Sequence, residues 1–475
     1  MAGDFTPVMS ATDSVMWAIE RDPDLRSTVT AVGLLDRPPD RAALRSRVEA
    51  AVEALPRLRQ RVVEPLFGIG QPRWVDDPFI DLDYHLRTVS AVPWNDRWLL
   101  DFASTLAEAG FDRDRPLWEF VVVEGLQGGG AALVQKVHHS LTDGVGAVEL
   151  MASILDWSRH PRRSHGLGPH EATQAPSRGA RNPAVNLARN VSKGVPAVLR
   201  AAADPIGTTR KVWLVGESAT RLLAPSGIRK SPVMTGHSTN WHFDVHEESL
   251  DSLRRAAHAA GGTVNAVFVA AVAGGLHRYH LKHGREVEAL QLNLPVSRRQ
   301  AGDPLGGNRF TPVRFSLPIA ELDPVARVRQ VGVECRKASH EPALPLTDAI
   351  ASVLSVLPPA ATTAVMGSLL RGTDAVATNI PGIDRRCYIA GAELLREFAF
   401  APLSGAAINV ALMSHAGEAC VGVNMDRAAV SDPEVLMTCL GESFAEIVAL
   451  GEPAPVEPAA LEPVAVASAP VEPTT

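Results

Sequence analysis

Cysteine is scarce in this chain of 475 residues, which contains only Cys335, Cys387, Cys420 and Cys439. No two of them are spaced as Cys-x-x-Cys, so the sequence predicts neither a zinc knuckle nor a disulfide framework. A reducing cytoplasm is therefore the expected compartment. A Gly-x-Ser-x-Gly elbow is also absent, which leaves little support for a serine acyl-enzyme of the hydrolase kind.

Long apolar runs are absent as well. The N-terminal residues lack a basic cap followed by an apolar stretch, so no secretion signal is expected. The longest uncharged segment, residues 349–370, approaches the length of a membrane span, but Pro358 and Pro359 at its middle would break a helix. We expect two short apolar helices that line an apolar tunnel or touch a membrane, although core packing is the commonest explanation for such a segment.

Positive charge is concentrated in one segment, although the whole chain has a net charge of −7. Residues 159–230 contain thirteen Lys and Arg against three Asp and Glu, a local net charge of +10. Residues up to 183 are typical of a linker, whereas residues 186–223 mix apolar and basic side chains at helical spacing. This pattern indicates contact with anionic lipid or, with equal weight, a solvated interdomain crossover. Nucleic-acid binding is not expected, because no aromatic-rich basic motif accompanies the charge.

Helical and strand-like patterns alternate on both sides of this basic segment. Helices are predicted at residues 41–55, 96–109, 145–157, 247–260, 264–281, 324–339 and 433–450. Strands are predicted at residues 118–123, 131–137 and 289–296, and near Ala375, Phe398, Ile408 and Val421. Mixed strands and helices in both halves, in a chain longer than one core usually organises, predict two α/β domains. The tail from residue 451, rich in Pro, Ala, Val and Glu, is expected to be disordered.

The strongest signal for function is the segment Val-His-His-Ser-Leu-Thr-Asp-Gly at residues 137–144. It directly follows a predicted strand, and a strand that ends at a histidine presents an imidazole at the edge of a sheet. There the imidazole can act as a general base on a hydroxyl that attacks an acyl carbonyl. A metal site at His138, His139 and Asp143 is the alternative, but the other histidines show no ligand-like spacing, so no metal is expected.

Further motifs follow one another along the chain. They are residues 9–13 (MSATD), 115–118 (RPLW), 294–298 (LPVSR), 307–308 (GN), 378–382 (TNIPG) and a closing segment, 406–432. Together with HHSLTDG, this ordered set resembles the bacterial wax ester synthase/acyl-CoA:diacylglycerol acyltransferase family over nearly the whole chain. The His–Asp motif alone is shared with the wider chloramphenicol acetyltransferase-like superfamily, including peptide-synthetase condensation domains. The chain departs from the family at Asn265–Ala266, where Asn-Asp is frequent.

The resemblance implies an α/β fold of two acetyltransferase-like lobes, each of mixed sheet and helices, with the active site in the channel between them. A long crossover would join the lobes. The expected boundaries are an N-terminal lobe at 1–158, a partly helical basic crossover at 159–235, a C-terminal lobe at 236–450 and a disordered tail at 451–475.

Within the HHSLTDG motif, the resemblance assigns the general base to His139 and a supporting role to His138. Asp143 suggests a carboxylate that orients the imidazole. In proteins with this motif, however, the aspartate is usually structural and pairs with an arginine. We expect that arginine to be Arg298, from the other half of the chain. Gly144 permits a backbone conformation or a close approach that a side chain would block.

The other motif residues have expected roles in packing or polar contacts. Pro116, Leu117 and Trp118 are expected to pack rather than to take part in chemistry. Asn265 is expected either to bind polar groups of the acyl donor or acceptor, or to cap a helix or hydrogen-bond in the core. Asn308 is a motif residue of the resemblance, with no chemical role assigned.

The resemblance implies long-chain acyl transfer from acyl-CoA to the hydroxyl of diacylglycerol or of a fatty alcohol, without an acyl-enzyme. Acyl-CoA is then a substrate, and no resident cofactor is expected. One alternative is a condensation-like or small-molecule O-acyltransferase. Another is a lipid-binding paralogue with impaired catalysis, for which Ala266 is the only hint. The enzyme is expected to be cytoplasmic and peripheral at an anionic membrane or lipid-droplet surface.

Overall fold

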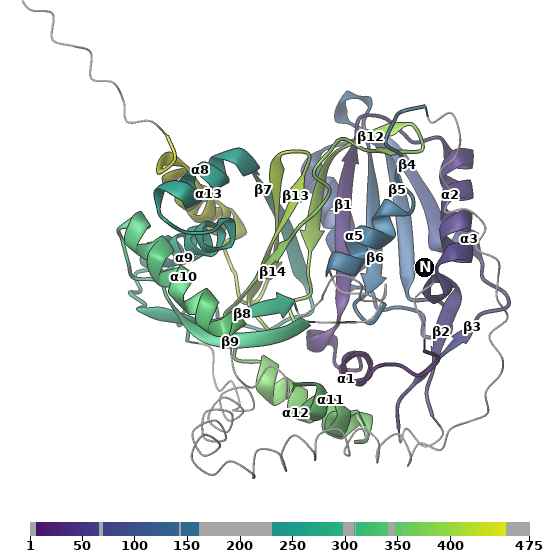
Figure 1. The fold of residues 1–475 in the computed structure, drawn as a ribbon, viewed down its shortest axis with the longest axis horizontal. Helices are drawn as coiled ribbons and strands as arrows, with labels where there is room; N and C mark the ends of the chain where they lie inside the picture. Colours follow the sequence, from purple (N-terminus) through teal and green to yellow (C-terminus); the bar gives the residue numbers. More distant parts are fainter. Residues whose placement is uncertain are drawn as a thin grey trace, which may run out of the picture.

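The protein consists of two six-stranded sheets that lie side by side, with helices around them (Figure 1). The structure is a computed structural model, and it describes residues 6–65, 70–141, 144–160, 230–297, 308, 310–340, 347–355 and 357–452. Each sheet combines parallel and antiparallel strands. The expected fold class, α/β with two lobes of mixed sheet and helices, is confirmed.

The first sheet has the strand order β11-β12-β1-β6-β5-β4. The bounds are β11 Tyr388–Ile389, β12 Ala392–Phe400, β1 Thr28–Leu35, β6 Ala131–His138, β5 Trp118–Leu126 and β4 Leu86–Trp94. Neighbouring strands are antiparallel except β4 and β5, which are parallel. One face packs against α2 (Arg41–Ala54) and α5 (Gly144–Ala152), and the other face packs against α4 (Asp96–Glu108).

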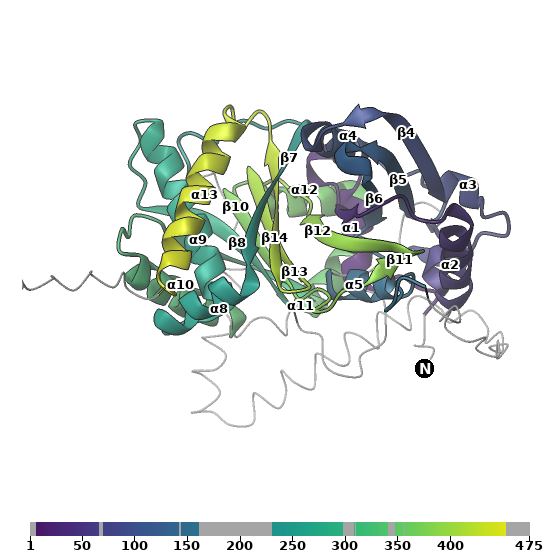
Figure 2. The same ribbon diagram turned by 90° about the horizontal axis from the view of Figure 1, so that it is seen from above.

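The second sheet has the strand order β7-β14-β13-β10-β8-β9. The bounds are β7 Trp241–Ser249, β14 Glu418–Asp426, β13 Ile408–His415, β10 Ala375–Ile380, β8 Ala289–Ser297 and β9 Phe310–Pro318. Its outer face is covered by α8 Leu250–Ala259, α9 Val264–Lys282, α10 Pro324–Ser339 and α13 Pro433–Ala449 (Figure 2). Helix α9 is apolar around most of its circumference because it lies in the middle of this layer.

The two halves of the chain exchange structure at β12. This strand belongs to the second half of the sequence, yet it pairs along its length with β1 of the first sheet. Between the sheets, Phe400 of β12 stacks on Phe243 of β7 with ring centroids 4.0 Å apart. The lobes are therefore joined by strand pairing as well as by side-chain packing. The lobe boundaries expected from the sequence stay predictions.

Three helices lie below the two sheets in Figure 1. They are α1 Ala11–Ile19, α11 Thr347–Leu354 and α12 Pro359–Leu370. Helix α1 contacts both α11 and α12, so it joins the N-terminal segment to the second half of the chain. The remaining elements are short: β2 Gln60–Val63, β3 Arg73–Asp76, α3 Leu82–His85, and the 3-10 turns Pro23–Leu25, Pro56–Arg59 and Gln127–Gly129.

Most predicted helices have the expected bounds, but two predictions were wrong at an end. The helix expected at 247–260 begins only at Leu250, because residues up to Ser249 pair with β14 as strand β7. The helix expected at 145–157 ends at Ala152, and Asp156 instead forms a β-bridge with Tyr388 and an ion pair with Arg47 at 2.5 Å.

Residues 349–370 form two helices, α11 and α12, as their central prolines predicted. Among the described residues, no one helix has both the length and the apolar character to cross a membrane; only α8 and α9 taken together pass that test, and they are bent by 93°. The predicted helix at 186–223, most of the basic segment and nearly all of the predicted disordered tail lie outside the described residues.

Candidate active site

Strand β6 brings the histidine motif to the end of the first sheet. All eight of its residues are buried, because it lies between β1 and β5 with both faces covered. The charge of Lys136 within it is matched by Glu119, whose Oε1 lies 3.0 Å from Nζ. Just past the strand, the main-chain N–H of His139 donates to the carbonyl oxygen of Ser27 at 2.8 Å. This bond extends the pairing of β6 with β1 by one residue, and it holds the main chain of His139 in place at the end of the sheet.

His138 is turned into the core and is fully buried. Its Nδ1 accepts from the main-chain N–H of Ser140 at 3.1 Å and lies 2.7 Å from the Ser140 hydroxyl. Nε2 must then carry the proton, which it donates to Glu20 Oε2 at 3.2 Å. Both ring nitrogens are thus used in structural contacts. The supporting role expected for His138 stays a prediction.

His139 points the other way and lines a cavity. Its Nδ1 lies 2.8 Å from the side-chain oxygen of Asn308. The side-chain nitrogen of Asn308 lies 2.6 Å from Asp13 Oδ1 and 2.7 Å from the carbonyl oxygen of His139. Asp13 Oδ2 in turn accepts from the Ser10 hydroxyl at 2.6 Å. The imidazole therefore lies at the end of a hydrogen-bonded row that leads back to the start of α1.

Two carboxyl groups lie near the histidines and differ in their pKa: Asp13 is buried, and Glu20 is partly exposed. Burial raises the pKa of Asp13 to about 6, although bonds from Ser10 and Asn308 oppose this shift. The side chain of Glu20 is largely withdrawn from solvent, which by itself would raise its pKa, but the contact with His138 and the main-chain N–H of Ser27 lower it. Glu20 is therefore an ionised partner for His138 at neutral pH.

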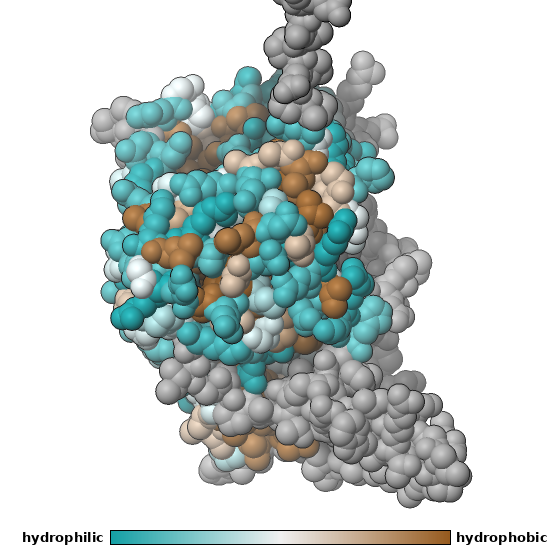
Figure 3. Space-filling model, turned by 90° about the vertical axis from the view of Figure 1, so that its left-hand side faces the viewer, coloured by the Kyte–Doolittle hydropathy of each residue, from teal (hydrophilic) through white to brown (hydrophobic). Residues whose placement is uncertain are grey.

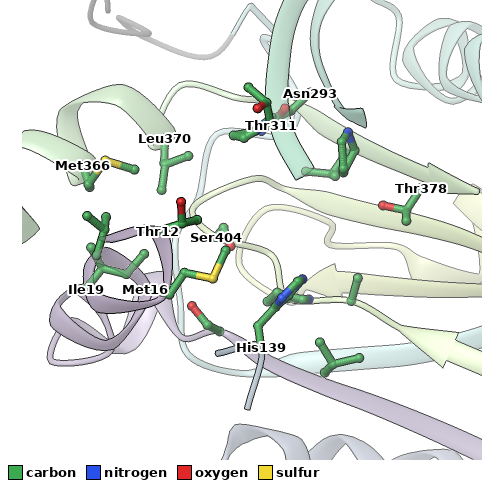
Figure 4. A pocket seen from close by; sticks show the side chains of 18 of the residues that line it. Thr12, Met16, Ile19, His139, Asn293, Thr311, Met366, Leu370, Thr378 and Ser404 are labelled. Atoms are coloured by element: carbon green, nitrogen blue, oxygen red, sulfur yellow. The ribbon is translucent and has the colours of Figure 1, made fainter. Parts of the chain in front are cut away.

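The cavity beside His139 has a volume of about 320 Å³. One side is apolar and is formed by helices α1, α11 and α12, with Met16, Ile19, Ile350, Leu354, Met366 and Leu370. The other side is formed by strands of the second sheet and contains Asn293, Thr311, Thr378, Asn379 and Asn409. In Figure 4, Met16 and Ile19 of α1 lie to one side of His139, and Thr378 of the second sheet lies to the other. The site can hold a ligand with a long apolar part and a polar reacting end.

The Asp143–Arg298 pair expected from the resemblance lies outside the described residues. It therefore stays a prediction. Gly144 is described as the first residue of α5, so the motif leads directly into a helix that packs against the first sheet.

Pro116, Leu117 and Trp118 belong to the packing of the first lobe. Leu117 and Trp118 are fully buried, and the indole N–H of Trp118 donates to the carbonyl oxygen of Leu58 at 2.8 Å. The ring of His85 stacks on Trp118 with centroids 4.5 Å apart. None of these residues lines the cavity.

Asn265 lies in the first turn of α9 and does not line the cavity. The neighbouring Ala266 is buried in the core of the second lobe, and its main-chain N–H donates to the capping Thr263 hydroxyl at 3.2 Å. The departure from the family's frequent Asn-Asp is thus located in the packing of α9 rather than at the cavity beside His139. The geometry gives Ala266 no direct contact with the cavity.

Sequence reasoning missed Glu20 and gave Asp13 no role in the site. Asp13 was visible only as a motif residue, and the spacing Ser10-x-x-Asp13 is typical of a helix N-cap. The structure shows that cap, since Ser10 accepts from the Asp13 main-chain N–H at 3.1 Å, and adds the contact with Asn308. Within the described ranges, no group of three or more His, Cys, Asp or Glu is placed to hold a metal ion.

Both the sequence and the fold of this chain are similar to those of known proteins. Residues 9–268 match the wax ester synthase/diacylglycerol acyltransferase catalytic domain, and residues 306–448 match the C-terminal domain of that family. A Mycobacterium tuberculosis protein named as a diacylglycerol O-acyltransferase is 37% identical over 470 residues, which cover 96% of this chain and 95% of the relative. A second M. tuberculosis protein with this designation is 26% identical, over 89% of this chain and 92% of its own.

Solved structures share the two-lobe fold. The wax ester synthase/diacylglycerol acyltransferase from Marinobacter aquaeolei has a TM-score of 0.63 and 22% identity, and covers 94% of this chain and 100% of its own. The first condensation domain of the calcium-dependent antibiotic synthetase has a TM-score of 0.58 and 17% identity, with 95% and 96% coverage. The two family domains and the relative at 37% identity together show that this chain is an acyltransferase of the wax ester synthase/diacylglycerol acyltransferase family.

Proposed function

We propose that this acyltransferase moves a long-chain acyl group from acyl-CoA to the hydroxyl of diacylglycerol, of a fatty alcohol, or of both. The observation that carries the proposal is the position of His139 between an apolar wall and a polar wall of one cavity. An acyl chain fits the side formed by α1, α11 and α12, since transfer of each methylene group from water into such surroundings contributes about 0.8 kcal/mol. The names of the relatives support the choice of diacylglycerol as an acceptor.

We propose His139 as the general base. The acceptor's hydroxyl loses its proton to the imidazole while its oxygen attacks the thioester carbonyl of acyl-CoA. The tetrahedral intermediate then collapses, the carbon–sulfur bond breaks, and the imidazolium returns the proton to the coenzyme A sulfur. The products are the ester and free coenzyme A, and His139 is restored. His138 is not the base in this scheme, because both of its ring nitrogens are bonded inside the core.

We further propose that the enzyme works at a lipid surface. Support comes from α11 and α12, whose inner sides line the cavity while Val353 and Val365 remain 59% and 40% exposed. Residues 349–370 contain no charged side chain. Figure 3 shows apolar side chains gathered at the lower end of the molecule, where α11 and α12 lie in Figure 1. A substrate that leaves the lipid phase beside this pair of helices would enter the cavity without crossing water.

The proposed activity can be tested with purified protein, labelled palmitoyl-CoA and a panel of acceptors. We expect labelled ester with diacylglycerol, with hexadecanol, or with both, and little product with short water-soluble alcohols. Transfer only from an acyl group carried on a carrier protein would favour the condensation-like alternative. Binding of palmitoyl-CoA with no ester from any acceptor would favour the lipid-binding alternative.

A further inference from the structure

We propose that Asn308 and Asp13 are positioning residues that hold His139 in the tautomer which a base in this cavity requires. The proposal rests on the proposed role of His139 for its catalytic meaning. The tautomer itself, however, can be measured without any substrate. The two residues are 295 positions apart in the chain, and the side chain of Asn308, two residues before β9, meets Asp13 of α1.

The orientation of the Asn308 amide follows from its partners. Its nitrogen lies 2.6 Å from a carboxylate oxygen of Asp13 and 2.7 Å from the main-chain oxygen of His139. Both partners accept hydrogen bonds, so the NH₂ group must face them and the amide oxygen must face away. A flipped amide would place an oxygen against two oxygens. The amide oxygen therefore faces His139 Nδ1 at 2.8 Å.

This orientation determines which ring nitrogen of His139 carries the proton. The amide oxygen of Asn308 can only accept, so Nδ1 must donate to it. In the neutral ring the lone pair is then on Nε2, where a base needs it to take a proton from a hydroxyl. Asn308 binds the main-chain oxygen of the same residue as well, so it holds both the backbone and the ring of His139.

Asp13 allows only one orientation of the Asn308 amide. Its side chain is 3% exposed, and its two oxygens are engaged by Asn308 and by the Ser10 hydroxyl. An ionised carboxylate has no proton to donate, so it accepts only the NH₂ side of the Asn308 amide. Burial raises its pKa to about 6, which is still below the pH of a neutral assay, so the ionised form predominates there. A neutral amide at position 13 would present either a donor or an acceptor and would no longer fix the orientation of Asn308.

The first test is a ¹⁵N spectrum of histidine-labelled full-length protein without substrate, recorded at a pH where the imidazole is neutral. The signals of His139 are identified as those that disappear from the spectrum of the His139→Gln variant. We expect the wild type to show a protonated Nδ1 and an unprotonated Nε2. Asn308→Ala should shift His139 toward the Nε2–H form, and Asp13→Asn, which preserves volume, should shift it part of the way. Asn424→Ala is the matched control: it removes a buried amide bonded to the Ala401 carbonyl at 3.1 Å, and it should leave the His139 signals unchanged.

The second test is kinetic and separates positioning from folding. Asn308→Ala should lower kcat with palmitoyl-CoA by about 10- to 100-fold, the loss typical when a group that orients a metal-bound histidine is removed, with KM changed by less than about twofold. The same substitution in the His139→Gln background should cost nothing further, because the base that it positions is gone.

Unchanged His139 signals in both Asn308→Ala and Asp13→Asn would overturn the proposal. It would also be overturned if Asn308→Ala lowered kcat by the same factor in the His139→Gln background as in the wild type. If the wild type transfers no acyl group, the proposed function fails while the spectra still decide the tautomer. The two failures are therefore distinguishable.

Discussion

At the scale of single residues, the burial of Glu397 should make stability depend on pH. Glu397 is 3% exposed on β12, and its hydrogen-bond partner is the side-chain nitrogen of Gln135 at 3.4 Å. Burial raises its pKa from 4.5 to about 7. Between these values the folded state holds a proton that the unfolded state has lost. Stability from this group is therefore present at low pH and falls as pH rises through the window.

We expect Glu397→Gln to remove this dependence. From pH 5.5 to 8, the free energy of unfolding of the wild type should fall by about 2 kcal/mol more than that of the variant, at ~1.36 kcal/mol per pH unit up to the folded-state pKa. Urea unfolding at several pH values measures the free energy of unfolding of the wild type and of the variant. The control Glu53→Gln, at an exposed position on α2, should follow the wild type. Parallel stability curves for the wild type and Glu397→Gln would show that Glu397 is ionised in the fold across this range.

The sequence predicted the position of one site residue for a physical reason and could not predict its partners. A buried apolar run followed by two histidines indicates a strand that ends at an imidazole, and β6 ends at His138 as this pattern predicts. Nothing local in the sequence indicates that Asn308 meets His139, because the contact arises only when the two halves pack together. Asp13 was hidden for another reason, since a helix cap already explains an acidic residue three positions after Ser10.

At the scale of elements, helices α11 and α12 should carry part of the contact with lipid. We expect Val353→Asp combined with Val365→Asp to weaken sedimentation with neutral phosphatidylcholine vesicles by about tenfold or more. The reason is that full burial of an aliphatic side chain contributes roughly 1.5–3 kcal/mol. The control Leu322→Asp changes a side chain that is 67% exposed outside this pair of helices, and it should bind as the wild type does.

The same experiment separates this surface from the basic segment. Attraction of residues 159–230 to anionic vesicles should weaken as salt is added, because exposed charges are screened. Binding through Val353 and Val365 should persist in salt. If the double variant binds neutral vesicles as well as the wild type does, α11 and α12 are not a lipid contact.

Helices were predicted well where their apolar residues recur at helical spacing and no strand pairing competes. Helix α10 has the predicted bounds, and α2, α4, α9 and α13 agree within one residue at each end. The start of α8 was wrong because residues 247–249 have a helical pattern but are paired with β14, so tertiary pairing outweighs the local signal. Helix α1 was not predicted, and its role became visible only through its packing against α11 and α12.

At the scale of the whole molecule, the halves should depend on each other for folding. Strand β12 lies between β11 and β1, so residues 1–229 alone would leave β1 as an exposed edge of mostly buried residues. Such an edge promotes aggregation. We expect fragments 1–229 and 230–475 to be insoluble when expressed separately and to form a soluble complex when expressed together. A folded, monomeric 1–229 fragment, shown by a cooperative thermal transition, would contradict this dependence.

The two-lobe plan was predictable from mixed elements on both sides of the basic segment, and from the ordered motifs. The pairing of β12 with the first sheet was not predictable, because residues 392–400 have the same strand pattern whichever sheet they join. Partner choice follows from the register with β1, in which Thr30 lies opposite Phe400, and from the stacking of Phe400 on Phe243. Such long-range choices depend on the assembled fold rather than on local pattern.

The most direct test of the central claim is the single-turnover rate of palmitoyl transfer in His139→Ala and His138→Ala, compared with the wild type in the same acceptor assay. We expect His139→Ala to lower the rate by about 10²- to 10⁴-fold, the contribution of a general base. His138→Ala should lower the rate much less and should mainly lower the melting temperature, because it removes the buried contacts to Glu20 and Ser140. A near-normal rate in folded His139→Ala, or a larger loss of rate in His138→Ala, would contradict the account.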